Sequence, residues 1–400
     1  MHDTVYCRQA EAGRCCIKVV QAFRHCGPFK FPGHLLALTL KQQETKRAIP
    51  FKKLYTSEGT ALENDLDEFF LLKAVKSSKK GRTPGIDGIA VELYLKLCDL
   101  LGPIWLEVIN HATNTGSLHG DLNTTLITVI PKPGKDHLEC ANYHPISLIN
   151  ADLKIFSKVI AYRMEQVIRN TINPDQTGFL KGRFSSDNNR RLLHILSSLH
   201  KIPPAWGLLF LDAEKAFDRL EWTYLWRVLE EFKFGEKCIS MIQILYSNPS
   251  VRVCVGDCFS ELFQIERGSR QGDPLSLLVF NLSIEPLAQL IRSCPQISPI
   301  TIGTSSHSVS LCADDTLIYM ANIQQSLPIV LEKLKHFDYL SGYKVNFSKS
   351  ALMLVNIDKQ AVSLPSEVVT VTETICLGIQ ICSSVTLTAK NNYLSFLKKF

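Results

Sequence analysis

The stretch 309–320, Val-Ser-Leu-Cys-Ala-Asp-Asp-Thr-Leu-Ile-Tyr-Met, constrains the fold more than any other part of the sequence. Apolar and β-branched residues flank Asp314 and Asp315, a pattern typical of two short strands joined by a tight turn. Neighbouring side chains of a strand point to opposite faces. A tight turn at this pair lets Asp314 project above the sheet while Asp315 stays near the same rim. Two anions ~4 Å apart repel by about 4 kcal/mol at an effective dielectric of ~20, which a divalent cation would offset. The alternative is a solvated surface turn, because Asp favours turns.

A third acid follows another apolar strand. Residues 208–211 form a strand pattern that ends at Asp212, and apolar residues at helical spacing come next. If the two strands are sheet neighbours, Asp212 meets Asp314 although the two lie far apart in the sequence. Mg²⁺ is usually held by one or two carboxylates together with substrate phosphates. Two such ions ~3.5–4 Å apart can activate a hydroxyl and stabilise a leaving oxygen, so the acids predict a phosphoryl-transfer site.

The composition is that of a folded chain with a mild positive charge. Hydrophobic residues make up 46% of the 400 residues, and the formal net charge is +6. This length can form two or three subdomains, and the charge allows a nucleic-acid partner without requiring one. None of the thirteen cysteines forms a C-x₂-C pair, and there is no cleavable signal, so we expect reduced thiols in the cytoplasm or nucleus. No apolar run of about 18 residues indicates a membrane span.

Three blocks occur in an order that resembles a known family. They read FLDAEKAFD from Phe210, GSRQGDPLSLLVFNL from Gly268 and CADDTLIYM from Cys312. In these blocks the chain resembles the reverse transcriptases of LINE-type non-LTR retrotransposons, and the resemblance runs from about Leu54 to Gln380. It implies an α+β right-hand polymerase fold, in which an antiparallel palm sheet is backed by helices and the fingers are made of helices and loops.

The resemblance also implies an organisation along the chain. We expect fingers at 54–205, a palm at 206–381, and the start of a thumb or a truncated tail at 382–400. Residues 1–53 match nothing in the family and lack steady periodicity, so we interpret them as a poorly ordered leader. A short apolar helix near 35–40, or a zinc site from the four cysteines of this leader, is the alternative there.

The reaction implied by the resemblance is RNA-directed DNA polymerisation, the addition of deoxynucleotides to a primer 3′-hydroxyl. Two Mg²⁺ ions, or Mn²⁺ in their place, would be held by Asp212, Asp314 and Asp315. The implied nucleotide contacts are Lys132, Ala213, Phe217, Gln271, Gly272 and Lys349. The implied template and primer contacts are Lys181, Arg183, Arg270, Leu377 and Gly378. The partners would be an RNA template, a DNA primer and deoxynucleoside triphosphates, without a membrane; the oligomeric state stays open.

Three positions depart from the family pattern. His144 stands where the family has arginine, and a neutral His lacks the fixed fork of donors that binds phosphate. Cys312 and Cys376 replace aromatic residues, which removes packing area but no metal ligand. These changes keep open a truncated, catalytically weak or dead retroelement remnant that acts at most as a nucleic-acid-binding module. An RNA-templated RNA polymerase or an intron maturase shares the palm acids, but AEKAFD and SRQGDPLS favour the LINE type.

Overall fold

The computed structural model describes residues 53–54, 56–118, 120–139, 142–198, 206–256, 258–357, 362 and 364–397. The expected leader, apart from Lys53, and its four cysteines lie outside the described residues. The chain divides into two compact units, which contain Leu54–Val167 with Lys233–Ser276, and Ile168–Phe232 with Leu277–Phe400. Each unit thus combines segments that are distant in the sequence. The boundaries of fingers, palm and thumb expected from the sequence stay predictions.

The first unit contains a mixed five-stranded sheet. Strand β1 (Thr124–Pro131) pairs antiparallel with β2 (Tyr143–Leu148) and parallel with β4 (Ser250–Val255). The short strands β5 (Cys258–Phe259) and β6 (Phe263–Gln264) both pair antiparallel with β4. A parallel pair needs a long connection. The chain between β1 and β4 accordingly passes through the second unit before it returns to the first unit at Lys233.

Helices make up the rest of the first unit. They are α3 (Thr56–Leu62), α4 (Glu68–Lys76), α5 (Val91–Lys96), α6 (Cys98–Thr115), the 3₁₀ helix η1 (Gly120–Asn123), most of α7 (Ala151–Thr171) and α11 (Glu236–Leu245). In α7, Leu153, Phe156, Ile160 and Met164 recur at helical spacing and are all buried. A stripe of this kind fixes the helix by apolar burial rather than by intrinsic helix propensity.

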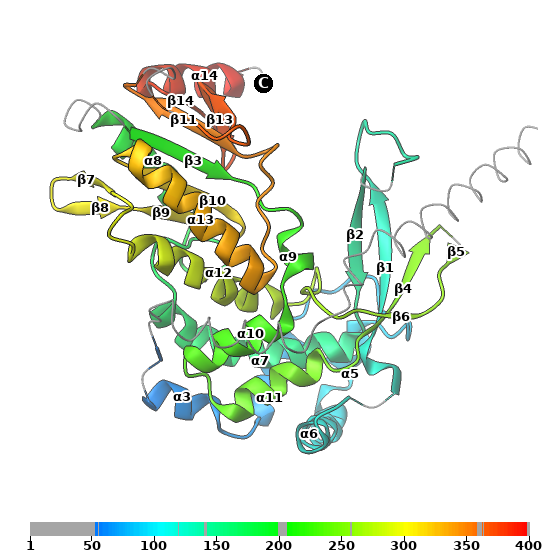
Figure 1. Cartoon of the computed structure of the whole chain (residues 1–400). Coiled ribbons are helices and arrows are strands. Elements are labelled where there is room, and N and C mark those ends of the chain that lie inside the picture. The colour runs from blue at the N-terminus through cyan, green and yellow to red at the C-terminus, as the bar shows by residue number, and fades with distance from the viewer. Residues whose placement is uncertain are drawn as a thin grey trace, which may run out of the picture. The chain divides into compact units, whose positions relative to one another are not determined.

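The second unit is built on a five-stranded sheet with the strand order β12-β11-β3-β10-β9 (Figure 1). The central strand β3 (Trp206–Leu211) is antiparallel to β10 (Asp315–Met320) and to β11 (Ala351–Val355). Strand β9 (Val309–Cys312) continues the antiparallel pattern, whereas the edge strand β12 (Thr370–Val371) runs parallel to β11. The sheet is therefore antiparallel, as expected, except at this edge.

Helices cover both faces of this sheet at β3, all of whose residues are buried. On one face, Trp206 and Leu208 belong to the same apolar cluster as Leu192 of α8 (Ser185–Ser197). On the other face, a Cβ on Gly207 would lie 2.4 Å from the Cδ1 atom of Ile323, the first residue of α13 (Ile323–Ser341). Since strand residues alternate between faces, the two contacts enclose β3 from opposite sides.

Among the described residues, the remaining elements of the second unit are three helices, two hairpins and the short helix α9 (Ala216–Arg219). The helices are α10 (Trp222–Glu231), α12 (Ser276–Arg292) and α14 (Val385–Leu397). The hairpins are β7 (Ile300–Ile302) with β8 (Ser305–His307), and β13 (Glu373–Cys376) with β14 (Ile379–Cys382). Among the described helices, none has both the length and the apolar character that a membrane span requires.

Candidate active site

The strands that carry the three acids are neighbours in the sheet of the second unit. Leu211 of β3 pairs with Thr316 of β10, so the next residues outward, Asp212 and Asp315, stand at the same end of the sheet. Cys312 pairs with Asp315, which leaves Ala313 and Asp314 as a two-residue loop between β9 and β10. The register therefore brings all three carboxylates to one rim.

Burial and mutual repulsion act on these carboxyl groups. Burial raises the pKa of Asp314, and the charge of Asp212 raises it further. Burial likewise raises the pKa of Asp315, with added contributions from Asp314 and Asp212. The three charges thus act on one another, and a bound cation would stabilise their ionised forms.

The rim offers the donors that Mg²⁺ prefers. In the described part of the chain, no group of three or more His, Cys, Asp or Glu side chains has the arrangement of a ready-made metal site. Mg²⁺ does not need such a cage, because it usually keeps several waters and completes its shell with substrate phosphates. Three carboxylates on adjacent strands fit that mode of binding.

The backbone of Asp212 is fixed by the segment that follows α13. The Asp212 carbonyl accepts a hydrogen bond from the Asn346 N–H at 2.8 Å, and the Asp212 N–H donates to Ser350 Oγ at 3.1 Å. Lys349, an expected nucleotide contact, places its Nζ atom 3.9 Å from Asp212 Oδ2. Sequence reasoning selected Lys349 but missed Ser350, a buried residue whose hydroxyl holds the strand end.

Two further expected nucleotide contacts lie in the same unit. Ala213 forms an isolated antiparallel bridge with Val345. Phe217 stacks on Phe280 of α12, with ring centroids 4.3 Å apart and an interplanar angle of 26°. The stacking fixes the ring of Phe217 just beyond the strand end that carries Asp212.

A cavity adjoins the carboxylates. Asp212, Asp315 and Lys349 line it, together with Cys312 and with residues 374–377 of the β13–β14 hairpin. Burial raises the pKa of the Cys376 thiol to about 12, so this thiol stays protonated at neutral pH. The cavity thus contains both positions at which cysteine replaces the aromatic residue of the family pattern.

The β13–β14 hairpin, expected to contact the primer, turns through Leu377 and Gly378. Their φ angles are 47° and 79°, as a two-residue loop with left-handed backbone requires. Glycine adopts this conformation readily, whereas leucine in it is strained. Strands β13 and β14 pair on either side of this turn, and the contact of Leu377 and Gly378 with a primer stays a prediction.

Two further expected nucleotide contacts, Gln271 and Gly272, are exposed residues of a loop in the first unit. Arg270 is only 5% exposed, and its guanidinium donates to the Leu245 carbonyl at 2.7 Å and to Asn123 Oδ1. The structure therefore does not favour the template contact predicted for Arg270, because the cation is buried and engaged inside the unit.

Lys132 and His144 lie in the sheet region of the first unit. The Lys132 N–H donates to the Asn142 carbonyl at 2.8 Å, just beyond the end of β1. His144, which replaces the family's arginine, is an exposed residue of β2 paired with Ile130. The nucleotide contact expected of Lys132 stays a prediction, and so does the effect of the departure at His144.

The two cations of the basic loop at 178–183 have different surroundings: one is exposed, and the other is hydrogen-bonded inside the protein. Lys181 is exposed and free to reach a phosphate backbone. Arg183 instead donates hydrogen bonds of 2.6–3.1 Å to four backbone carbonyls, those of Arg169, Ile172, Asn173 and Gln176. This engagement does not favour the template contact predicted for Arg183, because its donors hold the loop itself.

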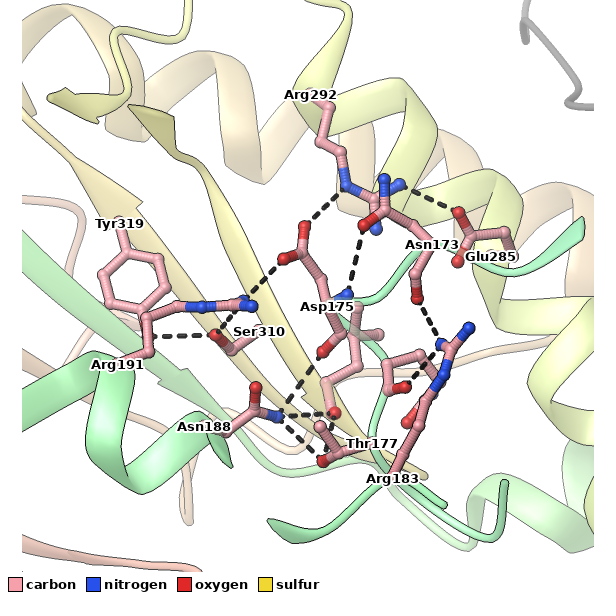
Figure 2. A network of polar contacts seen from close by, with 12 residues as sticks. Asn173, Asp175, Thr177, Arg183, Asn188, Arg191, Glu285, Arg292, Ser310 and Tyr319 are labelled. Atoms are coloured by element: carbon pink, nitrogen blue, oxygen red, sulfur yellow. Dashed lines mark hydrogen bonds and ion pairs between the residues drawn. The ribbon is translucent and has the colours of Figure 1, made fainter. Parts of the chain in front are cut away.

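A partly buried polar network around Asp175 was not predicted from the sequence. Figure 2 shows Asp175 between the guanidinium groups of Arg191 and Arg292, at 2.5 and 3.0 Å. Arg292 also pairs with Glu285 at 2.9 Å, and Glu285 is 1% exposed. Glu285 and Arg292 stand out in the sequence as charged residues of a strongly apolar helix, but that signal does not name their partners.

Carboxylates at the ends of adjacent antiparallel strands, beside a lysine and a cavity, are the arrangement typical of metal-dependent phosphoryl-transfer sites. The profile of the family described as "Reverse transcriptase (RNA-dependent DNA polymerase)" matches residues 130–381. The chain belongs to this family, and the expected resemblance to non-LTR retrotransposon reverse transcriptases is confirmed.

Several relatives show the extent of the likeness. "Transposon TX1 uncharacterized 149 kDa protein" of Xenopus laevis is 30% identical over 290 residues, which cover 72% of this chain and 22% of the relative. "Retrovirus-related Pol polyprotein from type-1 retrotransposable element R2" of Popillia japonica is 27% identical over 277 residues, with 69% and 38% covered. "Probable RNA-directed DNA polymerase from transposon BS" of Drosophila melanogaster is 29% identical over 256 residues, with 63% and 27% covered. The chain thus spans between about a fifth and two fifths of these relatives.

Proposed function

We propose that this chain adds deoxynucleotides to a primer 3′-hydroxyl, with RNA as the template. The observation that carries the proposal is the sheet register that sets Asp212 beside Asp315 and the Ala313–Asp314 loop. Two Mg²⁺ ions, or Mn²⁺ in their place, would supply an activated hydroxyl and a stabilised pyrophosphate leaving group. Asp212 and Asp314 would hold both ions, with Asp315 in support.

The chain's other residues would orient the substrates, because catalysis of phosphoryl transfer is mostly positioning and charge stabilisation. Phe217, held against Phe280, would lie under the nucleotide sugar, and Lys349 would face the phosphates. Gln271 and Gly272 would line the nucleotide pocket, and Lys132 would contact the triphosphate.

Nucleic acid would be bound by groups of the second unit. Lys181 would contact template or primer phosphates, and Leu377 with Gly378 would contact the primer end. In this assignment the sheet of the second unit is the palm, the sheet of the first unit belongs to the fingers, and 382–400 begins the thumb. The chain would act in the cytoplasm or the nucleus, where its templates and thiol-reducing conditions are found.

Primer extension on poly(rA)/oligo(dT) with Mg²⁺ tests the proposal. The unmodified chain should extend the primer, and Asp212→Asn or Asp314→Asn should lower the rate by about 10³-fold or more, because several kcal/mol of metal-dependent stabilisation is lost. The matched control is Glu332→Gln, which removes an exposed carboxylate of α13.

The outcome also separates the second candidate, a nucleic-acid-binding remnant. That candidate is favoured by Cys312 and Cys376, which reduce the aromatic surface around the cavity. If the unmodified chain extends nothing, and Asp212→Asn binds template–primer equally well, the polymerase proposal fails and the binding module stands.

A further inference from the structure

The Ala313–Asp314 turn between β9 and β10 has a strained backbone. Ala313 has a φ of 57°, a left-handed conformation that costs a residue with a Cβ atom about 1–2 kcal/mol. Such a conformation persists only where the surroundings hold it. Ala313 is 4% exposed, so its peptide groups must find their partners inside the protein.

One side chain supplies those partners. Gln176 Oε1 accepts hydrogen bonds from the Ala313 N–H at 2.9 Å and from the Gly178 N–H at 2.8 Å. Its Nε2 atom donates to the Ala313 carbonyl at 3.3 Å. Gln176 is fully buried, so a single amide satisfies both polar backbone groups of the residue that precedes Asp314.

The segment around Gln176 pairs directly with strand β9. The Thr177 N–H donates to the Leu311 carbonyl at 2.8 Å, and the Leu311 N–H donates to the Asp175 carbonyl at 2.9 Å. At Gly178 the backbones approach so closely that a Cβ would lie 2.1 Å from the Ala313 nitrogen. Since neither partner of this contact is a flexible side chain, the segment and the turn must move together.

The far side of the segment is anchored. Asp175 is held by Arg191 and Arg292 (Figure 2), and Asn281 of α12 donates to the Gly178 carbonyl at 2.7 Å. These ion pairs are partly buried, with side chains 14–23% exposed, and they tie the Asp175 carboxylate to α8 and α12. Gln176 therefore reaches the turn from a rigid support rather than from a mobile loop.

We propose that Gln176 is a positioning residue that holds the Ala313–Asp314 turn, and with it the carboxylate of Asp314, in the geometry that metal binding requires. The inference rests on the proposed function for its effect on rate, but the clamp itself is a property of the fold. A purely structural role predicts only lost stability, whereas the clamp predicts an altered metal dependence and altered dynamics at Ala313.

Two variants test the clamp. Gln176→Met keeps the length and loses every hydrogen bond, and Gln176→Glu keeps the acceptor but exchanges the donor for a second oxygen. Both should lower the extension rate constant by about a hundredfold, the usual effect of misplacing a reacting group by about 1 Å. Both should also require more Mg²⁺ for half-maximal rate.

The two variants should differ in how their activity depends on pH, because only Gln176→Glu introduces a carboxyl group that can be protonated. The carboxyl group introduced by Gln176→Glu matches the glutamine amide when it is protonated, because it can then donate to the Ala313 carbonyl. The activity of Gln176→Glu relative to Gln176→Met should therefore rise as the pH falls. A ratio that stays constant across the pH range would contradict the clamp.

The control is Thr388→Val, which removes a buried hydroxyl that accepts from the Cys382 N–H at 2.9 Å, away from the turn. It should lose stability without a change in Mg²⁺ dependence. Hydrogen exchange at the Ala313 amide gives a readout that needs no activity: exchange should quicken at least tenfold in Gln176→Met and stay unchanged in Thr388→Val.

Failure of the clamp and failure of the proposed function give different results. If the unmodified chain extends no primer but Ala313 exchange quickens in Gln176→Met, the function fails and the clamp stands. If Gln176→Met keeps the rate, the Mg²⁺ dependence and the Ala313 protection of the unmodified chain, the clamp is overturned. Should Gln176→Met not fold, the same three readouts on Gln176→Glu at pH 8 decide between these outcomes.

Discussion

The absence of a side chain at Gly178 lets residues 176–178 approach the Ala313–Asp314 turn. In Gly178→Ala the new Cβ would meet the Ala313 backbone, and we expect a loss of about 3 kcal/mol in the free energy of unfolding. The control is Gly303→Ala, whose Cβ has open space and meets only the strain of a φ near 59°. Urea unfolding of both variants checks this, and equal losses would contradict the close approach.

A buried acid in the first unit predicts a pH dependence of stability. Asp152 of α7 is 7% exposed, and burial raises its pKa to about 6 although its carboxylate accepts a hydrogen bond from the Leu153 N–H. The folded chain therefore keeps this proton to a higher pH than the unfolded chain, so stability falls as the pH rises from about 4 to about 6.

Replacing Asp152 with Asn should remove this loss. Asn keeps an acceptor for the Leu153 N–H and carries no charge, so it should raise the free energy of unfolding by about 2 kcal/mol at pH 7 and by little at pH 4. Urea unfolding at the two pH values measures the difference. The account of Asp152 fails if the gain is the same at both.

At the scale of elements, the β13–β14 hairpin combines a strained turn with an expected binding role. Leu377→Asn should stabilise the chain by about 0.5–1 kcal/mol, because asparagine tolerates the left-handed backbone better than leucine does. The same change should weaken primer binding if the Leu377 side chain, which lines the cavity, contacts the primer. Thermal unfolding and primer titration measure the two effects separately, and unchanged primer affinity would remove Leu377 from the primer contacts.

The elements that the sequence predicted well are those with a local pattern. The strands around Asp314 and the strand before Asp212 follow from apolar runs that end at acids, and their adjacency is confirmed by the register. The parallel edge strand β12 and the pairing of 175–177 with β9 had no local signal. Both depend on contacts between distant segments, which periodicity does not encode.

Charge type alone also did not reveal what the cations do. Arg183 and Arg270 stand in loops whose composition is typical of phosphate contacts, but their donors face carbonyls and an amide inside the protein. The internal hydrogen bonds of these two residues were not predictable, because burial of a loop arginine depends on the whole fold. Lys181 kept its expected exposure because nothing in the described chain packs over it.

At the scale of the whole molecule, each unit is assembled from segments that are separated in the sequence. Residues 168–232 belong with 277–400, so the order along the chain does not follow the order of the units. A contiguous assignment from sequence motifs cannot capture this, because motifs mark sites rather than the segments that pair behind them.

Nucleic-acid binding by the whole chain should depend on salt. Lys181→Ala should lower the steepness of log affinity against log salt by about 1 for a template–primer duplex, since one phosphate contact is lost. Arg183→Ala should instead lower the free energy of unfolding, because four carbonyls lose their donor. Fluorescence anisotropy across a salt series, paired with urea unfolding, measures both effects. If Arg183→Ala changed the salt dependence and Lys181→Ala lowered the stability, the assigned roles would be contradicted.

Counting bound Mn²⁺ by electron paramagnetic resonance, with template–primer and a non-incorporable nucleotide present, tests the shared metal site most directly. The account predicts about two ions for each chain, and none at this site in the Asp212→Asn, Asp314→Asn double variant. An ion count that is the same in the double variant and the unmodified chain would contradict it.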